Sequence, residues 1–351
     1  MAQDGHLILK PSIAVIVPNW NDARYLPRCL RSVLNQEAGP EELIVIDDKS
    51  TDDSVDVIRS LIAGNPRAEL VVNPVNLGTN GALNEGLRRT RCDYVLFLAA
   101  NDFVLPGIFA RAKSCITRAP GVGLWSAMAW RVDEEDRPVR LHPSAVVALD
   151  DAAFSPEQCV KLAYRFGNWF TGTTLIYRRD ALEAVGGFDP AYGAPSDLIT
   201  ALVVASLHGA AYSPDPLAAI RIHSGSFSAA TLTDLARLDA ILEQITQRGP
   251  SMSPLLFSAA FLERTALRNR FASVRESRGA LLPEVAARLT SRRRSVLFIV
   301  NRLVPHGWWR LRVALAFLIL RPFDIAPALV HRLFGWAIVR LRVYMRGEGP
   351  P

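Results

Sequence analysis

Residues 13–21 read IAVIVPNWN and residues 43–54 read LIVIDDKSTDDS, and these two stretches decide the fold class. Each opens with four or five apolar residues, which predicts a short buried strand, and each then turns abruptly polar. Between them, residues 25–34 show the apolar spacing of a helix. This part of the chain is therefore predicted as strand, helix, strand, with polar side chains after each strand.

The same alternation continues along the chain. Further helices are predicted at 55–62 and 81–89, and further strands at 70–72 and 94–98. Repeated βα units predict an α/β fold with a mainly parallel sheet and helices on both faces. Ligands bind outside the carboxyl ends of such strands. We therefore expect the polar residues at the strand ends to face one crevice, namely 19–22, 47–52 and Asn101-Asp102.

The chain has 351 residues, of which half are hydrophobic and about a fifth are charged. That length and composition suit one large core with an appendage, hence one or two domains. The four cysteines lie far apart without a Cys-x-x-Cys pair, which argues against a zinc site or a disulfide framework and suits a reducing compartment. No secretion signal is expected in the polar residues 1–10.

Charge is distributed unevenly. Residues 288–346 contain twelve arginines and one acid, Asp324, so this segment carries +11 of a total formal charge of +6 and the rest carries −5. The arginines alternate with Trp, Phe, Leu and Ile, which indicates an anionic lipid surface as partner and not nucleic acid. The longest apolar run in the segment, 313–320, is far shorter than the roughly 20 residues of a spanning helix.

An ordered series of motifs carries a family resemblance. It comprises residues 16–21 and 46–54, Asn76-Leu77-Gly78, residues 84–87, Leu96-Phe97-Leu98 before Asn101-Asp102, Gly186-Gly187-Phe188-Asp189, Ser196-Asp197 and Arg221-Ile222-His223. The series resembles that of the family 2 glycosyltransferases, which use nucleotide-activated sugars. The resemblance implies a GT-A fold over 1–230, with a donor half at about 11–103 and an acceptor half at about 104–230. A helical extension at 231–294 and a membrane-associating tail at 295–351 are expected to follow.

On that resemblance, Asp48 recognises the base or ribose of the donor, while Pro18 and Asn21 shape the base pocket. A turn and helix cap before Ser50 is the structural alternative for Asp48. The family's Asp-x-Asp motif, which holds a divalent metal on the diphosphate, is replaced here by Ala99-Ala100-Asn101. Asp102, helped by the carbonyl oxygen of Asn101, could still bind Mg²⁺ or Mn²⁺.

The resemblance also assigns the reacting groups. Asp197 matches the general base that takes the proton of the acceptor hydroxyl, with inversion at the anomeric carbon, although it could simply begin a helix. Arg221 and His223 match the loop that neutralises the departing diphosphate. Trp169 could line the acceptor sugar pocket, but aromatic residues in such runs more often belong to the core.

The tail and the whole function leave alternatives open. In the tail, Arg332, Arg340, Arg342 and Arg346 share one helix face, which suits an in-plane amphipathic helix or a helix packed on the protein. The leading hypothesis is a cytoplasmic glycosyltransferase, peripheral on the inner face of a membrane, that builds a cell-surface polysaccharide on a glycan or lipid-linked acceptor. A catalytically weak nucleotide-sugar-binding or scaffolding protein is the alternative. A sugar nucleotidyltransferase is disfavoured, because no Gly-rich loop follows the first strand.

Overall fold

The computed structural model describes residues 11–193, 195–222, 233–320 and 334–345. All seven elements predicted in the first hundred residues are present, with bounds within three residues of those expected. They are β1 (Ile13–Asn19), α1 (Leu26–Leu34), β2 (Glu42–Asp47), α2 (Ser54–Ile62), β3 (Ala68–Val72), α3 (Gly78–Arg89) and β4 (Tyr94–Phe97). The period of the apolar pattern was sufficient to predict each of them, because every strand is short and followed by polar residues.

The strands form one mixed sheet with the order β3-β2-β1-β4-β9-β6-β10-β5. The first four strands are mutually parallel, as predicted. Beyond β4 the sheet is mixed, since β9 runs antiparallel to both β4 and β6 while β10 is parallel to β6. The remaining strands are β5 (Phe103–Val104), β6 (Leu124–Val132), β7 (Pro138–Leu141), β8 (Ala152–Phe154), β9 (Ile176–Arg178) and β10 (Ala210–Arg221).

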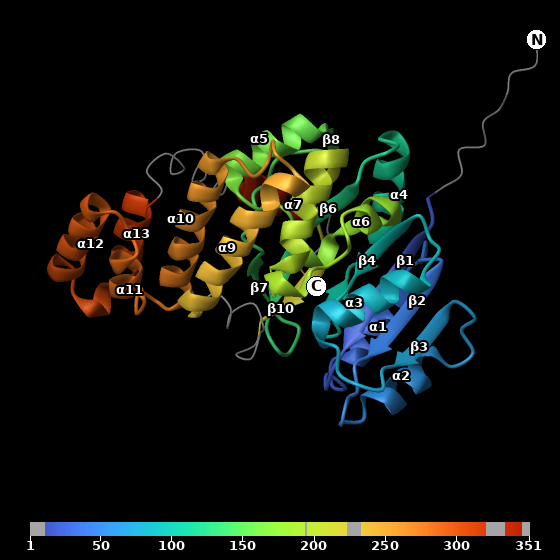
Figure 1. Ribbon diagram of the computed structural model, residues 1–351. Coiled ribbons are helices and arrows are strands. Elements are labelled where there is room, and N and C mark those ends of the chain that lie inside the picture. Colours follow the sequence, from blue (N-terminus) through green and yellow to red (C-terminus); the bar gives the residue numbers. More distant parts are fainter. Residues whose placement is uncertain (1–10, 194, 223–232, 321–333, 346–351) are drawn as a thin grey trace, which may run out of the picture.

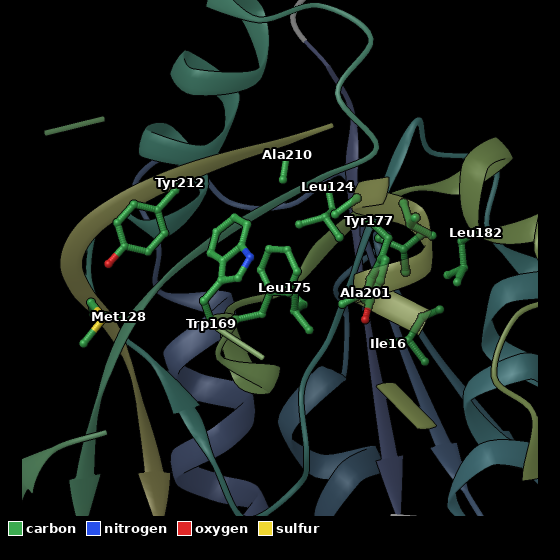
Figure 2. Close-up of a cluster of buried hydrophobic side chains, with 14 of the residues drawn as sticks. Ile16, Leu124, Met128, Trp169, Leu175, Tyr177, Leu182, Ala201, Ala210 and Tyr212 are labelled. Carbon is green, nitrogen blue, oxygen red and sulfur yellow. The ribbon is translucent and has the colours of Figure 1, made fainter. Parts of the chain in front are cut away.

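Helices cover both faces of the sheet because each central strand is apolar on both sides. In β1, Ile13, Val15 and Val17 pack into the cluster under α1 and α2, whereas Ile16 packs under α3 on the opposite face. The helices that complete the two layers are α4 (Ile108–Arg118), α5 (Pro156–Phe166), α6 (Arg179–Ala184) and α7 (Ser196–His208). Figure 2 shows the core on the α3 side, where Ile16 lies near Tyr177 and Leu182.

A helical region follows the sheet and extends from the side away from β1–β3 (Figure 1). It contains α9 (Leu235–Met252), α10 (Ala259–Glu276), α11 (Leu282–Ala287), α12 (Ser291–Leu303) and α13 (Trp309–Leu320). Leu267, Val285, Leu297 and Val313 share one buried cluster, so α10 to α13 form a unit. The predicted division at 294/295 falls inside α12.

The last described helix, α15 (Trp336–Met345), packs on the α/β part of the chain that contains the sheet. Val339 and Val343 are buried in the main core cluster, and Arg342 forms an ion pair with Asp150 at 3.1 Å. Of the two alternatives for this helix, these contacts favour the one packed on the protein, because Val339 and Val343 between the arginines are buried. Arg332 and Arg346 lie outside the described residues. Among the described helices, none combines the length and hydropathy needed to cross a bilayer.

Candidate active site

Two loops at the ends of β1 and β2 are tied together by Asn21. Its Oδ1 accepts hydrogen bonds from the backbone N–H of Thr51 at 2.7 Å and from the Thr51 hydroxyl at 3.3 Å, and its own N–H donates to Ser50 Oγ at 3.0 Å. Asn21 has a positive φ of 57°, a conformation that asparagine tolerates better than most residues. Pro18, in β1, is paired with Ile46 of β2. The predicted base-pocket residues Pro18 and Asn21 thus lie beside the β2 loop.

Asp48 is buried at the end of β2 and organises the loop before α3. Its Oδ1 accepts from Asn73 Nδ2 at 2.8 Å, and the backbone N–H of Leu77 donates to Oδ1 and Oδ2 at 2.9 and 3.0 Å. The turn before Ser50 is capped by Asp47 instead, which accepts from the Ser50 N–H at 2.9 Å. The structural alternative considered for Asp48 therefore belongs to its neighbour. Asn73 was missed from the sequence, although it directly follows β3.

Asp102 lies at the end of β4, where its carboxylate is enclosed by protein donors. Oδ2 accepts from the Thr173 hydroxyl at 2.6 Å, and Oδ1 accepts from the backbone N–H of Arg221 at 2.9 Å. Burial raises the pKa of Asp102 to about 6, against the lowering effect of these hydrogen bonds and of the Arg221 charge. Asp102 thereby links three segments: the loop after β4, the turn 172–174 and the end of β10.

Arg221 is buried at the end of β10, whereas the sequence predicted that it begins a polar loop. Its guanidinium donates to the Asn101 carbonyl oxygen, forms an ion pair with Asp136 and stacks 4.3 Å from the centroid of the Tyr25 ring. The Nε has no hydrogen-bond partner among the described residues. A guanidinium so engaged can contribute positive charge to the site but is not placed to grip a diphosphate directly. His223 lies outside the described residues.

The residues at the end of β4 do not fit a divalent metal. Mg²⁺ and Mn²⁺ prefer carboxylates supported by further oxygen ligands. Asp102 is the one carboxylate remaining beside the replaced motif, each of its oxygens accepts a hydrogen bond from the protein, and the Asn101 carbonyl oxygen that would assist it accepts from the Arg221 cation. Within the described ranges, no group of three or more His, Cys, Asp or Glu side chains could hold an ion. The predicted metal role of Asp102 is therefore unsupported by its surroundings, which sequence spacing alone could not reveal.

Asp197 occupies the first turn of α7. Its Oδ1 accepts from the Leu198 N–H at 2.7 Å, and the carboxylate also interacts with the backbone N–H of Asp197 itself. A Cβ built on Gly172 would lie 2.7 Å from Oδ2, so the turn 172–174 passes directly against the carboxylate. Burial raises the pKa of Asp197 to about 6. Because Thr173 holds Asp102, this one turn brings Asp197 and Asp102 to the same region.

Trp169 does not line a surface pocket. It is fully buried and packs against Phe170, Tyr212 and Phe154. Figure 2 shows the Trp169 ring beside Tyr212. The acceptor-pocket role predicted for Trp169 is therefore corrected in favour of the core alternative, because the β8 and β10 strands enclose its ring.

Charged groups that no sequence motif indicated surround Arg221. Arg24 pairs with Glu134 at 2.8 Å, and Arg28 lies 3.6 Å from Asp136. Both acids belong to the turn between β6 and β7, whose sequence DEED over 133–136 is a visible charge run. Arg24 lies in the turn before α1 and Arg28 lies in the first turn of that helix, so both lie near the start of α1.

The chain is similar in sequence and in fold to known glycosyltransferases. A glycosyltransferase of Nostoc sp. without a characterised activity is 33% identical over 181 residues, which cover 51% of this chain and 54% of that protein. A GalNAc(5)-diNAcBac-PP-undecaprenol beta-1,3-glucosyltransferase of Campylobacter jejuni is 35% identical over 98 residues, covering 28% of this chain and 32% of that protein. The chain thus spans about half or less of these curated relatives.

A mannosyltransferase from Pyrobaculum calidifontis, solved in complex with GDP-Man and Mn2+, superposes with a TM-score of 0.52 at 20% identity, covering 91% of this chain and 88% of that one. At this identity the likeness shows the fold, which is of the GT-A type. Residues 14–138 match the family described as Glycosyl transferase family 2. The expected resemblance is confirmed over these residues, which cover the donor half of the chain and match the family 2 glycosyltransferases.

Proposed function

We propose that the chain is an inverting glycosyltransferase that moves a sugar from a nucleoside diphosphate donor to a hydroxyl group. The observation that carries this proposal is Asp197, a carboxylate that lies against Gly172 in the first turn of α7 and whose pKa burial raises to about 6. Near neutral pH such a group is ionised yet more basic than an ordinary aspartate. It suits the removal of a proton from an acceptor hydroxyl as the oxygen attacks the anomeric carbon.

The donor half supplies recognition of the nucleotide. Each carboxylate oxygen offers two acceptor positions, and Asp48 Oδ2 accepts only the Leu77 N–H among the described donors. One acceptor position therefore remains for a base N–H or a ribose hydroxyl. Pro18 and Asn21 would form the wall beside it, and Arg221 with His223 would contribute positive charge toward the departing diphosphate. The mannosyltransferase neighbour binds GDP-Man, which supports a nucleotide sugar as donor.

We also propose a peripheral location on the cytoplasmic face of a membrane, with a glycan or lipid-linked acceptor in cell-surface polysaccharide synthesis. The lipid-linked substrate in the name of the Campylobacter relative supports the acceptor class. The supporting surface is formed by α12, α13 and the turn between them, where the following apolar side chains are exposed: Phe298, Ile299, Leu303, Trp308 and Leu311. Arg294, Arg302 and Arg310 are exposed on the same helices. Apolar side chains among cations are typical of binding to anionic lipid.

A panel of nucleotide sugars tests the catalytic proposal. The matching donor should raise the unfolding temperature by a few degrees at saturating concentration. The same donor should then release its nucleoside diphosphate in the presence of a lipid-linked or glycan acceptor. Stabilisation without turnover across all acceptors would favour the binding or scaffolding protein that the lost Asp-x-Asp motif suggests. No stabilisation by any nucleotide sugar would overturn the proposal.

A further inference from the structure

Three arginines from separate parts of the chain face one acidic turn. Arg24 precedes α1, Arg28 lies on α1 and Arg221 ends β10, while the turn comprises residues 133–136 between β6 and β7. Arg24 pairs with Glu134, and Asp136 lies between Arg28 and Arg221. The turn is itself ordered, because the Asp133 N–H donates to the Arg137 carbonyl at 3.0 Å and the Asp136 N–H donates to the Asp133 carbonyl at 3.2 Å.

This cluster lies where a donor diphosphate would need positive charge. The Arg28 guanidinium is 4.3 Å from the centroid of the Phe103 ring, and Phe103 directly follows Asp102. Arg221 contacts the Asn101 carbonyl at the same strand end. Carboxyl ends of strands are where ligands bind in open α/β sheets. The positions that would carry metal-binding carboxylates are Ala99 and Asn101 here, so the strand end is left with cations and no suitable metal ligands.

The members of the cluster differ in how easily they can change partners. The side chains of Arg24 and Arg28 are 63% and 50% exposed, and that of Glu134 is 43% exposed. Exposed ion pairs contribute little and exchange readily for a better anion. Arg221 is buried and keeps its place. Asp136 has a positive φ of 65°, which aspartate adopts at some conformational cost. The hydrogen bonds of the turn maintain this backbone conformation, and the backbone in turn fixes where the Asp136 carboxylate lies.

We propose that Arg24 and Arg28 bind the diphosphate of the donor, and that the acidic turn 133–136 occupies them until the donor arrives. Two guanidinium groups match the oxygens of a diphosphate in charge and in hydrogen-bonding geometry. The acidic side chains of the turn then compete with the donor diphosphate for the two arginines. A ligand with too little negative charge does not displace these side chains and binds weakly. The inference rests on the proposed function, because it takes the donor to be a nucleoside diphosphate sugar.

Calorimetric titration of the full chain with inorganic pyrophosphate, UDP and GDP, in excess chelator, tests the arginines. Arg24→Gln and Arg28→Gln should each weaken pyrophosphate binding roughly three- to tenfold. Arg31→Gln is the matched control, because Arg31 is an exposed arginine on the same helix α1 with no ion pair among the described residues. Its affinity for each probe should equal that of the unmodified protein.

The same titrations test the turn. Glu134→Gln releases Arg24 without touching a buried group, and it should tighten pyrophosphate binding roughly two- to fivefold. Glu135→Gln is its control, because Glu135 pairs with Arg137 and not with the cluster. Asp136→Asn should tighten binding further while preserving the backbone, since asparagine also tolerates a positive φ. Thermal unfolding of each variant checks that the fold persists, and Glu134→Gln decides the matter if Asp136→Asn is unstable.

The outcomes separate this inference from the proposed function. If UDP or GDP binds equally to the unmodified protein and to both arginine variants, the inference is overturned and the function stands. Binding that appears only after Mn²⁺ is added, or that weakens in Glu134→Gln, also overturns it. If pyrophosphate binding depends on Arg24 and Arg28 while no nucleotide sugar or nucleoside diphosphate binds, the anion site stands and the proposed function fails.

Discussion

At the scale of single residues, Asp197 carries the sharpest expectation. Asp197→Asn keeps the size of the side chain and an oxygen to accept the Leu198 N–H, but it removes the base. Donor affinity should survive while the turnover number falls by roughly 10²-fold or more. Calorimetry with the donor and a steady-state transfer assay measure the two quantities. Wild-type turnover in this variant would leave Asp197 as a helix-start residue, and the base would have to lie elsewhere.

The raised pKa of Asp197 sets the direction of the pH dependence. The base must be ionised, so the turnover number should rise with pH through about 6 and level off above it. Asp102 titrates in the same range, so the residual activity of Asp197→Asn is the control and should lack this acid limb. Asp197 and Asp102 both bind their protons more tightly in the folded protein than in the unfolded chain. Their protonated forms therefore stabilise the fold most below about pH 4, and this contribution to the free energy of unfolding is lost as the pH rises through about 6. An acid limb near pH 4 would contradict the assignment.

The residue types were predictable from the sequence, but their surroundings were not. Asp197 and Asp48 lie in the motifs that predicted them, and both are at the expected strand or helix ends. The burial of Arg221 depends on Asp136, 85 residues earlier in the chain, and no local pattern reports that pairing. Trp169 looks the same in sequence whether it stacks on a sugar or packs against Tyr212. Long-range packing therefore decided each correction.

At the scale of elements, the site depends on how closely the turn 172–174 approaches α7. Gly172→Ala would place a Cβ 2.7 Å from Asp197 Oδ2, so either the carboxylate or the turn must shift. We expect turnover to fall at least tenfold with a change of at most about 1–3 kcal/mol in the free energy of unfolding. Transfer kinetics and denaturant unfolding measure these effects.

Gly39→Ala is the control for that substitution, because a Cβ there would make only an ordinary contact at 3.5 Å with the Gln36 carbonyl oxygen. It should leave turnover and stability unchanged. Equal turnover in Gly172→Ala and Gly39→Ala would mean that the turn does not position the base.

The order of helices and strands was well predicted in the donor half, where each βα unit is local. The mixed pairing of β9 and β6 was not, since antiparallel contacts between distant strands leave no period in the sequence.

At the scale of the whole molecule, the charge asymmetry was visible in the sequence but its placement was not. The arginine-rich segment was expected to act as one tail. Instead α12 and α13 complete a helical unit with α10 and α11, while α15 returns to the α/β part of the chain. A truncation before Ser295 would therefore uncover Leu282 and Val285 and confound membrane binding with unfolding. Surface substitutions on α12 and before α13 give a cleaner test.

Leu303 and Trp308 are 74% and 63% exposed, so serine at both positions should leave the fold intact. Burying each side chain in a lipid interface contributes on the order of 1 kcal/mol or more, hence Leu303→Ser with Trp308→Ser should weaken binding to anionic vesicles by roughly tenfold or more. Leu255→Ser is the control, because Leu255 is 68% exposed but lies outside α12 and α13. Cosedimentation with phosphatidylglycerol vesicles, and with neutral vesicles for comparison, measures the change. The arginines predict that high salt weakens the binding of the unmodified protein as well. If the double variant sediments as fully as Leu255→Ser, the α12–α13 surface is not the lipid contact, and the exposed residues there would instead mark a site for another protein.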